Sequence, residues 1–140
     1  MDNLLVTRSA ETCRRRLRRD TARTSPETGE NERMMVPEIA ANAVPENAYL
    51  LDVREIDEWQ AGHAPHAVHI PLGHLQARVD ELPQGDTVYV ICRVGGRSAQ
   101  AAMWLNHIGR KAINVDGGMQ SWAAAGRSMV SETGTPPYVA

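Results

Sequence analysis

Short apolar runs alternate with amphipathic stretches along most of the chain, and the two patterns predict different elements. Apolar runs with few polar interruptions predict buried strands, whereas apolar positions three to four residues apart predict helices. The strands predicted in this way span 49–53, 68–70, 87–91 and 112–115. The predicted helices span 37–44, 55–61, 73–82, the stretch after Ser98 up to 108, and 119–125. Strand and helix therefore alternate along the chain.

This alternation predicts an α/β fold in which helices cover both faces of a parallel sheet. The run Thr87 to Ile91 has little polar alternation, as a strand buried on both faces requires. We expect three layers, α/β/α, with a central, mainly parallel sheet of about five strands. The active crevice of such a sheet lies beyond the carboxyl ends of its strands. Cys92 directly follows the clearest strand and so is predicted to lie at such an end.

Residues 1–33 differ in composition, because they are rich in Arg, Thr and Glu and poor in apolar side chains. Ordering a residue costs roughly 1 to 2 kcal/mol of backbone entropy, which side chains this polar do not offset. We therefore expect a disordered Arg-rich tail at 1–33, a folded domain at 34–130 and a flexible C-terminal tail at 131–140. An alternative is that translation begins at Met34 or Met35.

The basic run from Arg14 to Arg19 raises the question of an anionic partner such as nucleic acid. Acidic residues surround the run, and no aromatic side chain is interleaved to stack on bases, so we expect no nucleic-acid partner. The whole chain of 140 residues has a net charge of -2 and 42% hydrophobic residues. These values exclude a wholly disordered chain and a strongly basic nucleic-acid binder.

The chain has two cysteines, Cys13 and Cys92, too few for the disulfide framework of a small secreted domain. Its early apolar run is too short for a signal peptide, and no stretch approaches the ~20 apolar residues of a membrane helix. We therefore expect a cytoplasmic protein with no membrane partner.

The segment from Cys92 to Ser98 has the features of a reactive cysteine loop. A thiolate at the start of a helix is stabilised by free N–H groups and by the helix dipole. Two glycines, Gly95 and Gly96, let successive N–H groups converge on one point, and two arginines, Arg93 and Arg97, add positive charge. A buried, inert cysteine is the simpler alternative, but it would need neither the diglycine nor the arginines.

Three separated motifs carry a family resemblance. They are LLDVREIDEWQAGHAPHAVHIPL, VYVICRVGGRSAQAAMWL and NVDGGMQSW, in this order between about 36 and 127. Together they resemble the rhodanese homology domain of single-domain sulfurtransferases. The resemblance implies that Cys92 attacks the outer sulfur of a donor such as thiosulfate and holds that sulfur as a persulfide. A small-molecule thiol, cyanide or a thiol carrier protein would then accept it.

The length of the loop bears on the subtype. Related phosphatases separate the cysteine and the arginine by five residues, whereas four residues lie between Cys92 and Arg97. The shorter loop resembles the sulfurtransferase form, so a phosphatase or arsenate reductase is disfavoured. A non-catalytic interaction module is the remaining alternative, although idle versions are expected to lack the cysteine. The substrate-binding residues implied beside catalytic Cys92 are Arg93, Val94, Gly95, Gly96, Arg97 and Ser98.

Other residues receive structural interpretations. Arg54 and Glu58 are expected to form an ion pair four residues apart. Ser98 is expected either to donate a hydrogen bond in the loop or, as the favoured role, to cap the following helix. Three histidines spaced three apart invite a metal site, but prolines interrupt the segment, so we expect neither a metal nor a cofactor. These histidines are His63, His66 and His69. Cys13 is a weak candidate for a thiol that resolves the Cys92 persulfide.

Overall fold

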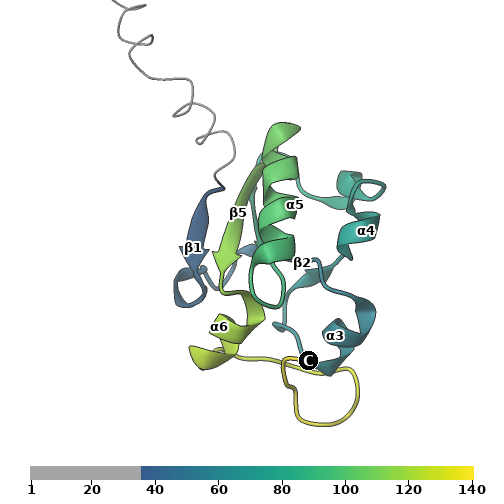
Figure 1. Ribbon diagram of the computed structural model, residues 1–140, viewed down its shortest axis with the longest axis vertical. Helices are drawn as coiled ribbons and strands as arrows, with labels where there is room; N and C mark the ends of the chain where they lie inside the picture. The colour runs from purple at the N-terminus through teal and green to yellow at the C-terminus, as the bar shows by residue number, and fades with distance from the viewer. Residues whose placement is uncertain (1–35) are drawn as a thin grey trace, which may run out of the picture. The chain divides into compact units, whose positions relative to one another are not determined.

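The computed structural model describes residues 36–140, which form a three-layer α/β/α domain (Figure 1). The expected Arg-rich tail at 1–33, together with Cys13, lies outside the described residues. The strands are β1 (Glu38–Ala40), β2 (Tyr49–Asp52), β3 (Val68–His69), β4 (Thr87–Ile91) and β5 (Lys111–Asp116). The helices are α3 (Ile56–Ala61), α4 (Leu72–Leu75), α5 (Gly96–His107) and α6 (Gly118–Ala124). Two short 3-10 helices, η1 (Ala41–Ala43) and η2 (Val79–Glu81), complete this part of the chain.

The five strands of this part form one sheet in the order β1-β5-β4-β2-β3, and every neighbouring pair is parallel. The predicted α/β class and parallel sheet are therefore confirmed. β4 lies at the centre, with β5 on one side and β2 on the other. Because all strands run the same way, the segments that follow β2, β4 and β5 meet at one edge of the sheet.

Alternate residues of β4 face two separate cores, which is why its sequence is apolar throughout. Val88 and Val90 join the core under α4 and α5, which also contains Leu51, Leu75 and Leu105. Ile91 joins the opposite core with η1 and α6, which also contains Leu50, Val115, Met119 and Trp122. The strand is buried on both faces, as the sequence pattern predicts.

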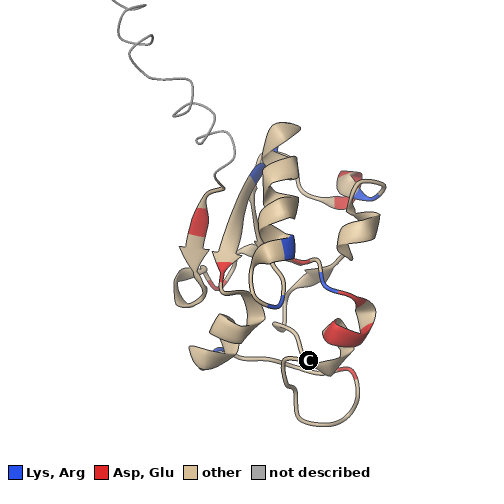
Figure 2. Ribbon diagram, viewed as in Figure 1, with Lys and Arg blue, Asp and Glu red and all other residues tan. Residues whose placement is uncertain are grey.

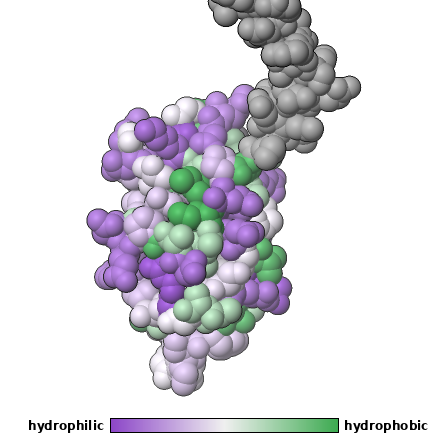
Figure 3. Space-filling model, turned by 90° about the vertical axis from the view of Figure 1, so that its left-hand side faces the viewer, coloured by the Kyte–Doolittle hydropathy of each residue, from purple (hydrophilic) through white to green (hydrophobic). Residues whose placement is uncertain are grey.

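The helix predicted over 37–44 is wrong. The segment instead forms β1, in which Ile39 is paired with Val115 of β5, followed by the single turn η1. The N–H of Asn114 donates to the carbonyl of Pro37 at 2.8 Å. Pairing with the open edge of β5 satisfies backbone groups that a helix would leave at the edge of the sheet. Figure 3 shows the face that carries this edge strand, where apolar residues lie among polar ones.

The helix predicted over 73–82 is also wrong, because the segment is divided into α4 and η2. Arg78, between them, has φ -115° and ψ 15°, outside the helical range. The guanidinium of Arg110 donates to the carbonyls of Val79 and Leu82, both at 3.3 Å. These bonds attach η2 and the residue that follows it to the segment between α5 and β5. Leu75 and Leu82 still enter the core as their apolar pattern requires.

The segment that follows α6 returns to α3. His63 and Val130 form an antiparallel bridge, and the N–H of Tyr138 donates to the carbonyl of Ala61 at 3.1 Å. Residues 131–140 contain no helix or strand, and their flexibility stays a prediction. Among residues 36–140, no helix has the length and apolar character needed to cross a membrane.

Candidate active site

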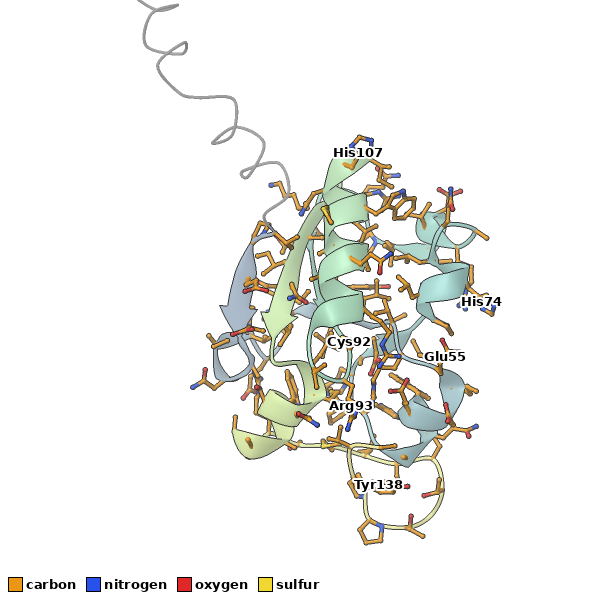
Figure 4. All side chains as sticks on the ribbon, viewed as in Figure 1. Glu55, His74, Cys92, Arg93, His107 and Tyr138 are labelled. Carbon is orange, nitrogen blue, oxygen red and sulfur yellow. The ribbon has the colours of Figure 1, made fainter. Side chains whose placement is uncertain are left out.

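Cys92 is the first residue after the central strand, and the loop it begins leads directly into α5. Figure 4 shows it at the lower end of α5, close to Arg93. The residue is 1% exposed. Its backbone is held from the other side by α6: the N–H of Met119 donates to the carbonyl of Cys92 at 2.7 Å, and that of Gln120 to the carbonyl of Arg93 at 3.0 Å. The loop is therefore fixed between two helices.

The Cys92 sulfur has three donor groups of its own loop within hydrogen-bonding distance. Sγ lies 3.1 Å from the N–H nitrogen of Gly95, 3.3 Å from that of Ser98 and 3.3 Å from the Ser98 hydroxyl, whose single proton it shares with a second acceptor, Asn114. Gly95 has φ 112°, a conformation that favours glycine, and this turn aims its N–H at the sulfur. The loop is a nest of donors around a single atom.

These donors change the acidity of the thiol. Burial raises the pKa of Cys92, but the Ser98 hydroxyl and the N–H groups of Ser98, Gly95 and Val94 outweigh it, so the pKa lies below its ordinary value. The thiolate is the nucleophilic form of cysteine, so a lowered pKa increases the reactive population near neutral pH.

The side chain of Arg97 is held by an acidic residue of α3. Its two terminal nitrogens donate to the two oxygens of Glu58 at 2.8 and 2.9 Å. Hydrogen bonding to Arg97 lowers the pKa of Glu58 to about 2, and the same bond raises the pKa of Arg97. Arg97 is therefore held as a fixed cation that braces the loop. Figure 2 shows acidic residues gathered on α3 and basic residues on the facing loop.

The expected ion pair between Arg54 and Glu58 is wrong. The Arg54 guanidinium is fully buried and instead donates to Asp52 at 2.7 to 3.1 Å, and to the carbonyl of Gly62 at 2.8 Å. Asp52 ends β2, so the pair lies at the same edge of the sheet as the cysteine loop. Glu58 lies 39 residues before Arg97 in the sequence, and the two are paired because the fold brings α3 close to the start of α5.

Arg93 and Val94 lie on the outer side of the loop, and both are exposed. Within residues 36–140, no side-chain hydrogen bond or ion pair occupies Arg93. Its cation is free to meet an anionic molecule, which distinguishes it from Arg97. Gly96 is the first residue of α5.

The favoured capping role of Ser98 is wrong, and the residue has the alternative role of hydrogen-bond donor. Gly95 occupies the N-cap position of α5, and no side chain caps this helix. Ser98 is buried in the first turn, where its hydroxyl contacts both Cys92 Sγ and the Oδ1 atom of Asn114, the latter at 2.5 Å. Sequence reasoning missed Asn114. The available signal was a polar residue inside a strand predicted to be covered on both faces.

The spaced histidines have structural contacts. The rings of His63 and His69 both stack on Trp59, with centroids 3.5 and 4.8 Å away. His66 instead lines a hollow of about 420 Å³, together with residues that follow η1 and residues at and after the end of α6; none of the residues from Cys92 to Ser98 lines it. Within the described part of the chain, no three His, Cys, Asp or Glu side chains are grouped as metal ligands.

The parallel sheet and the cysteine loop at the carboxyl end of its central strand define a class of α/β domain with a sulfur atom at the crevice. The family model described as Rhodanese-like domain matches residues 36–125. The chain therefore belongs to the rhodanese-like domain family.

Relatives and solved structures agree with this membership. The chain is 43% identical over 94 residues to the Bacillus subtilis protein named "Putative sulfur carrier protein YrkF", a match covering 62% of this chain and 51% of that protein. The chain thus spans about half the length of that relative. It is 33% identical over 90 residues to a protein named sulfurtransferase from Allochromatium vinosum, covering 64% of this chain and 84% of that one.

Among solved structures, a rhodanese-related protein from Thermoplasma volcanium is similar, with a TM-score of 0.64 and 34% sequence identity. The similarity covers 67% of this chain and 97% of that chain.

Proposed function

We propose that this protein is a sulfurtransferase that carries a sulfane sulfur as a persulfide on Cys92. The observation that carries the proposal is the environment of the sulfur: a buried Sγ atom that accepts hydrogen bonds from Gly95 and Ser98 and whose pKa is lowered. Relatives named as a sulfur carrier and a sulfurtransferase support the same chemistry.

The reaction takes place in two displacement steps. The Cys92 thiolate attacks the outer sulfur of an anionic donor such as thiosulfate; a bond between Sγ and that sulfur forms, the sulfur–sulfur bond of the donor breaks, and sulfite leaves with the electron pair. The negative charge now lies on the outer sulfur of the persulfide. An acceptor thiolate then attacks this sulfur, and the electron pair of the broken bond restores the Cys92 thiolate.

The loop residues have different roles in this proposal. The N–H groups around Sγ stabilise the thiolate before the attack and after the release of sulfur. Arg93 attracts the anionic donor, because its guanidinium is exposed and unpaired among the described residues. Arg97, paired with Glu58, holds the loop in place and adds a fixed positive charge near the sulfur.

The acceptor is proposed to be an external thiol. Cys92 is a free cysteine, and no other cysteine belongs to residues 36–140. A small thiol or a thiol carrier protein would meet the persulfide at the loop mouth, where Arg93 and Val94 are exposed. A free, easily oxidised thiol works in a reducing environment, so a cytoplasmic location is part of the proposal.

The test measures the intact mass of the purified protein after incubation with thiosulfate, before and after a reducing agent. We expect a gain of one sulfur atom that the reducing agent removes. The gain should vanish in Cys92→Ser and persist in Cys13→Ser, which is the matched control. No gain from thiosulfate or a small-molecule persulfide, together with phosphate release from an aryl phosphate, would overturn the proposal.

A further inference from the structure

A chain of buried polar contacts runs from the Cys92 sulfur across the sheet to the edge strand. The Ser98 hydroxyl lies 3.3 Å from Sγ and 2.5 Å from Asn114 Oδ1. The Asn114 amide nitrogen then donates to Glu38 Oε2 at 2.9 Å. Asn114 is 1% exposed and Ser98 fully buried, whereas Glu38 is exposed on β1. These hydrogen bonds therefore connect the cysteine with a carboxylate on the edge strand.

The chemistry of these groups fixes the direction of each hydrogen bond. A carboxylate only accepts, so the amide nitrogen of Asn114 must face Glu38, and its carbonyl oxygen Oδ1 must face Ser98. This oxygen also only accepts, so the Ser98 proton points at Asn114. The hydroxyl has one proton and two acceptors, Oδ1 and a thiolate sulfur, and cannot serve both at once.

We infer that Asn114, oriented by Glu38, is a positioning residue that controls whether the Ser98 proton is available to the Cys92 sulfur. While Cys92 is a thiol, its S–H can donate to the Ser98 oxygen and the Ser98 proton stays on Asn114, so every group is satisfied. When the thiolate forms, the hydroxyl can add its hydrogen bond to those of the N–H groups only by turning toward Sγ, which leaves the buried Asn114 oxygen without a donor. The contact with Asn114 thus opposes the thiolate.

The direction of the Ser98 proton also matters in the persulfide state of Cys92, a consequence that rests on the proposed function. In the persulfide the charge lies on the outer sulfur and Sγ is neutral, so the Ser98 proton returns to Asn114. This series of hydrogen bonds therefore favours the two states in which Sγ carries no charge, the thiol and the persulfide. Asn114 would help to retain a transferred sulfur until an acceptor arrives.

Other charged groups near the loop act on the sulfur through the electrostatic field instead of through a hydrogen bond. Arg97 from α5 is paired with Glu58 from α3, Arg93 lies on the loop itself, and the Asp52–Arg54 pair ends β2. α6 carries no charged residue. These groups act through charge, whereas Asn114 acts through the direction of one hydroxyl. An experiment that changes the direction without changing the charge separates the two.

The test uses the full chain and measures the rate at which iodoacetamide alkylates Cys92 as a function of pH, with Cys13→Ser as the background. In Glu38→Ala the amide of Asn114 loses its acceptor and is free to turn its nitrogen toward Ser98, which releases the hydroxyl proton to Sγ. We expect alkylation at acidic pH to become about fivefold faster, the effect of one hydrogen bond. Asn114→Leu should have the same effect.

Glu38→Gln is the matched control, because it removes the charge but keeps an oxygen that accepts from Asn114. Its pH profile should stay that of the parent protein. In a Ser98→Ala background, Glu38→Ala should have no effect, because the hydroxyl through which it acts is missing. Equal profiles for Glu38→Gln and Glu38→Ala, or a Glu38→Ala effect that persists without Ser98, would overturn the inference.

The alkylation readout does not depend on sulfur transfer. A protein that shows the expected profiles but never gains sulfur would refute the proposed function and leave the role of Asn114 in place. A protein that gains sulfur while Glu38→Ala has an unchanged profile would refute only the positioning role. Circular dichroism of each variant identifies any that fail to fold. Because Glu38 is exposed, the Glu38 variants should fold, and their alkylation profiles can be compared even if a variant at a buried position does not.

Discussion

The two arginines of the loop differ in what they can do, although they are separated by only three residues. Arg97 is joined by both terminal nitrogens to Glu58, whereas Arg93 is exposed and has no side-chain partner among residues 36–140. A bidentate pair fixes both the position and the charge of a guanidinium. Binding of a donor anion is therefore expected to depend on Arg93, and the geometry of the loop on Arg97.

Replacement of Arg93 tests this division. In Arg93→Ala we expect the KM for thiosulfate to rise severalfold while kcat changes little, because the side chain attracts the donor without touching Sγ. The effect should shrink at high salt, which screens exposed charges. Steady-state kinetics at two ionic strengths measure both. Arg93→Lys keeps the charge and should retain most of the affinity; a kcat effect as large as the KM effect would contradict this assignment.

The ion pair of Glu58 and Arg97 makes the stability of the folded protein depend on pH in the acidic range. The pKa of Glu58 falls from its ordinary value of 4.5 to about 2 in the folded protein, chiefly through its hydrogen bond with Arg97. A lowered pKa stabilises the fold above the ordinary value, and this stabilisation is lost as the pH falls from 4.5 toward 2. Because both side chains are partly exposed to solvent, it amounts to about 1 kcal/mol at neutral pH.

Thermal unfolding of the parent protein and Glu58→Gln at several pH values measures this contribution. The variant should have a lower Tm at pH 7, and the two curves should converge below pH 3. A difference in Tm that is the same at all pH values would mean that packing, rather than the charge of Glu58, is responsible.

At the scale of the elements, the sequence predicts best what depends on local pattern. β4 was expected with its observed bounds, and the cysteine loop was expected between a strand and a helix, because alternation of apolar runs and glycines carries that information. β1 was expected as a helix, since its pairing with β5 depends on an edge about 75 residues further along the chain. The sequence of residues 38–40 alone does not indicate a partner strand that lies so far along the chain.

The same limit applies to the site. Cys92 and its neighbours are contiguous and could be predicted together. The partner of Arg97 lies 39 residues before it, and the partner of Asn114 lies 76 residues before it. The buried position of Asn114 becomes meaningful only when β1, β5 and α5 are placed side by side. Contacts between distant segments are therefore what the structure adds to the sequence.

The N-terminus of α6 is the element that supports the loop from behind, and Gly118 makes this contact possible. Its φ is 56°, and a Cβ atom there would overlap the backbone of Cys92 and Arg93. In Gly118→Ala we expect the loop to be displaced, with a lower Tm and loss of sulfur loading. Gly126→Ala is the matched control: its φ is 75°, yet no atom lies within 4 Å of the added carbon.

The comparison of these two variants separates backbone strain from overlap. Both pay about 1 kcal/mol for a side chain in the left-handed region. Intact-mass measurement with thiosulfate should show normal loading in Gly126→Ala and little or none in Gly118→Ala. Equal loading in the two variants would show that the loop does not need the close approach of α6.

At the scale of the whole molecule, the segment 131–140 is hydrogen-bonded to α3 and to His63. The N–H of Glu132 donates to the carbonyl of Gln60 at 2.8 Å, and that of Tyr138 to the carbonyl of Ala61 at 3.1 Å. The Glu132 carboxylate lies 2.8 Å from His63 Nε2. Each of these bonds ends on α3 or directly after it, and α3 supplies Glu58 to the cysteine loop.

Removal of residues 131–140 distinguishes a flexible tail from a segment that supports α3. If these contacts stabilise the domain, the shortened protein should have a lower Tm and faster hydrogen exchange in α3, because the carbonyls of Gln60 and Ala61 lose their donors and His63 its carboxylate. Arg97 would then be less firmly held, and sulfur loading should slow. Glu132→Gln keeps the backbone contacts, so its decrease in Tm should equal only the portion that comes from the contact between Glu132 and His63. An unchanged Tm and exchange pattern after removal would instead establish 131–140 as a flexible tail.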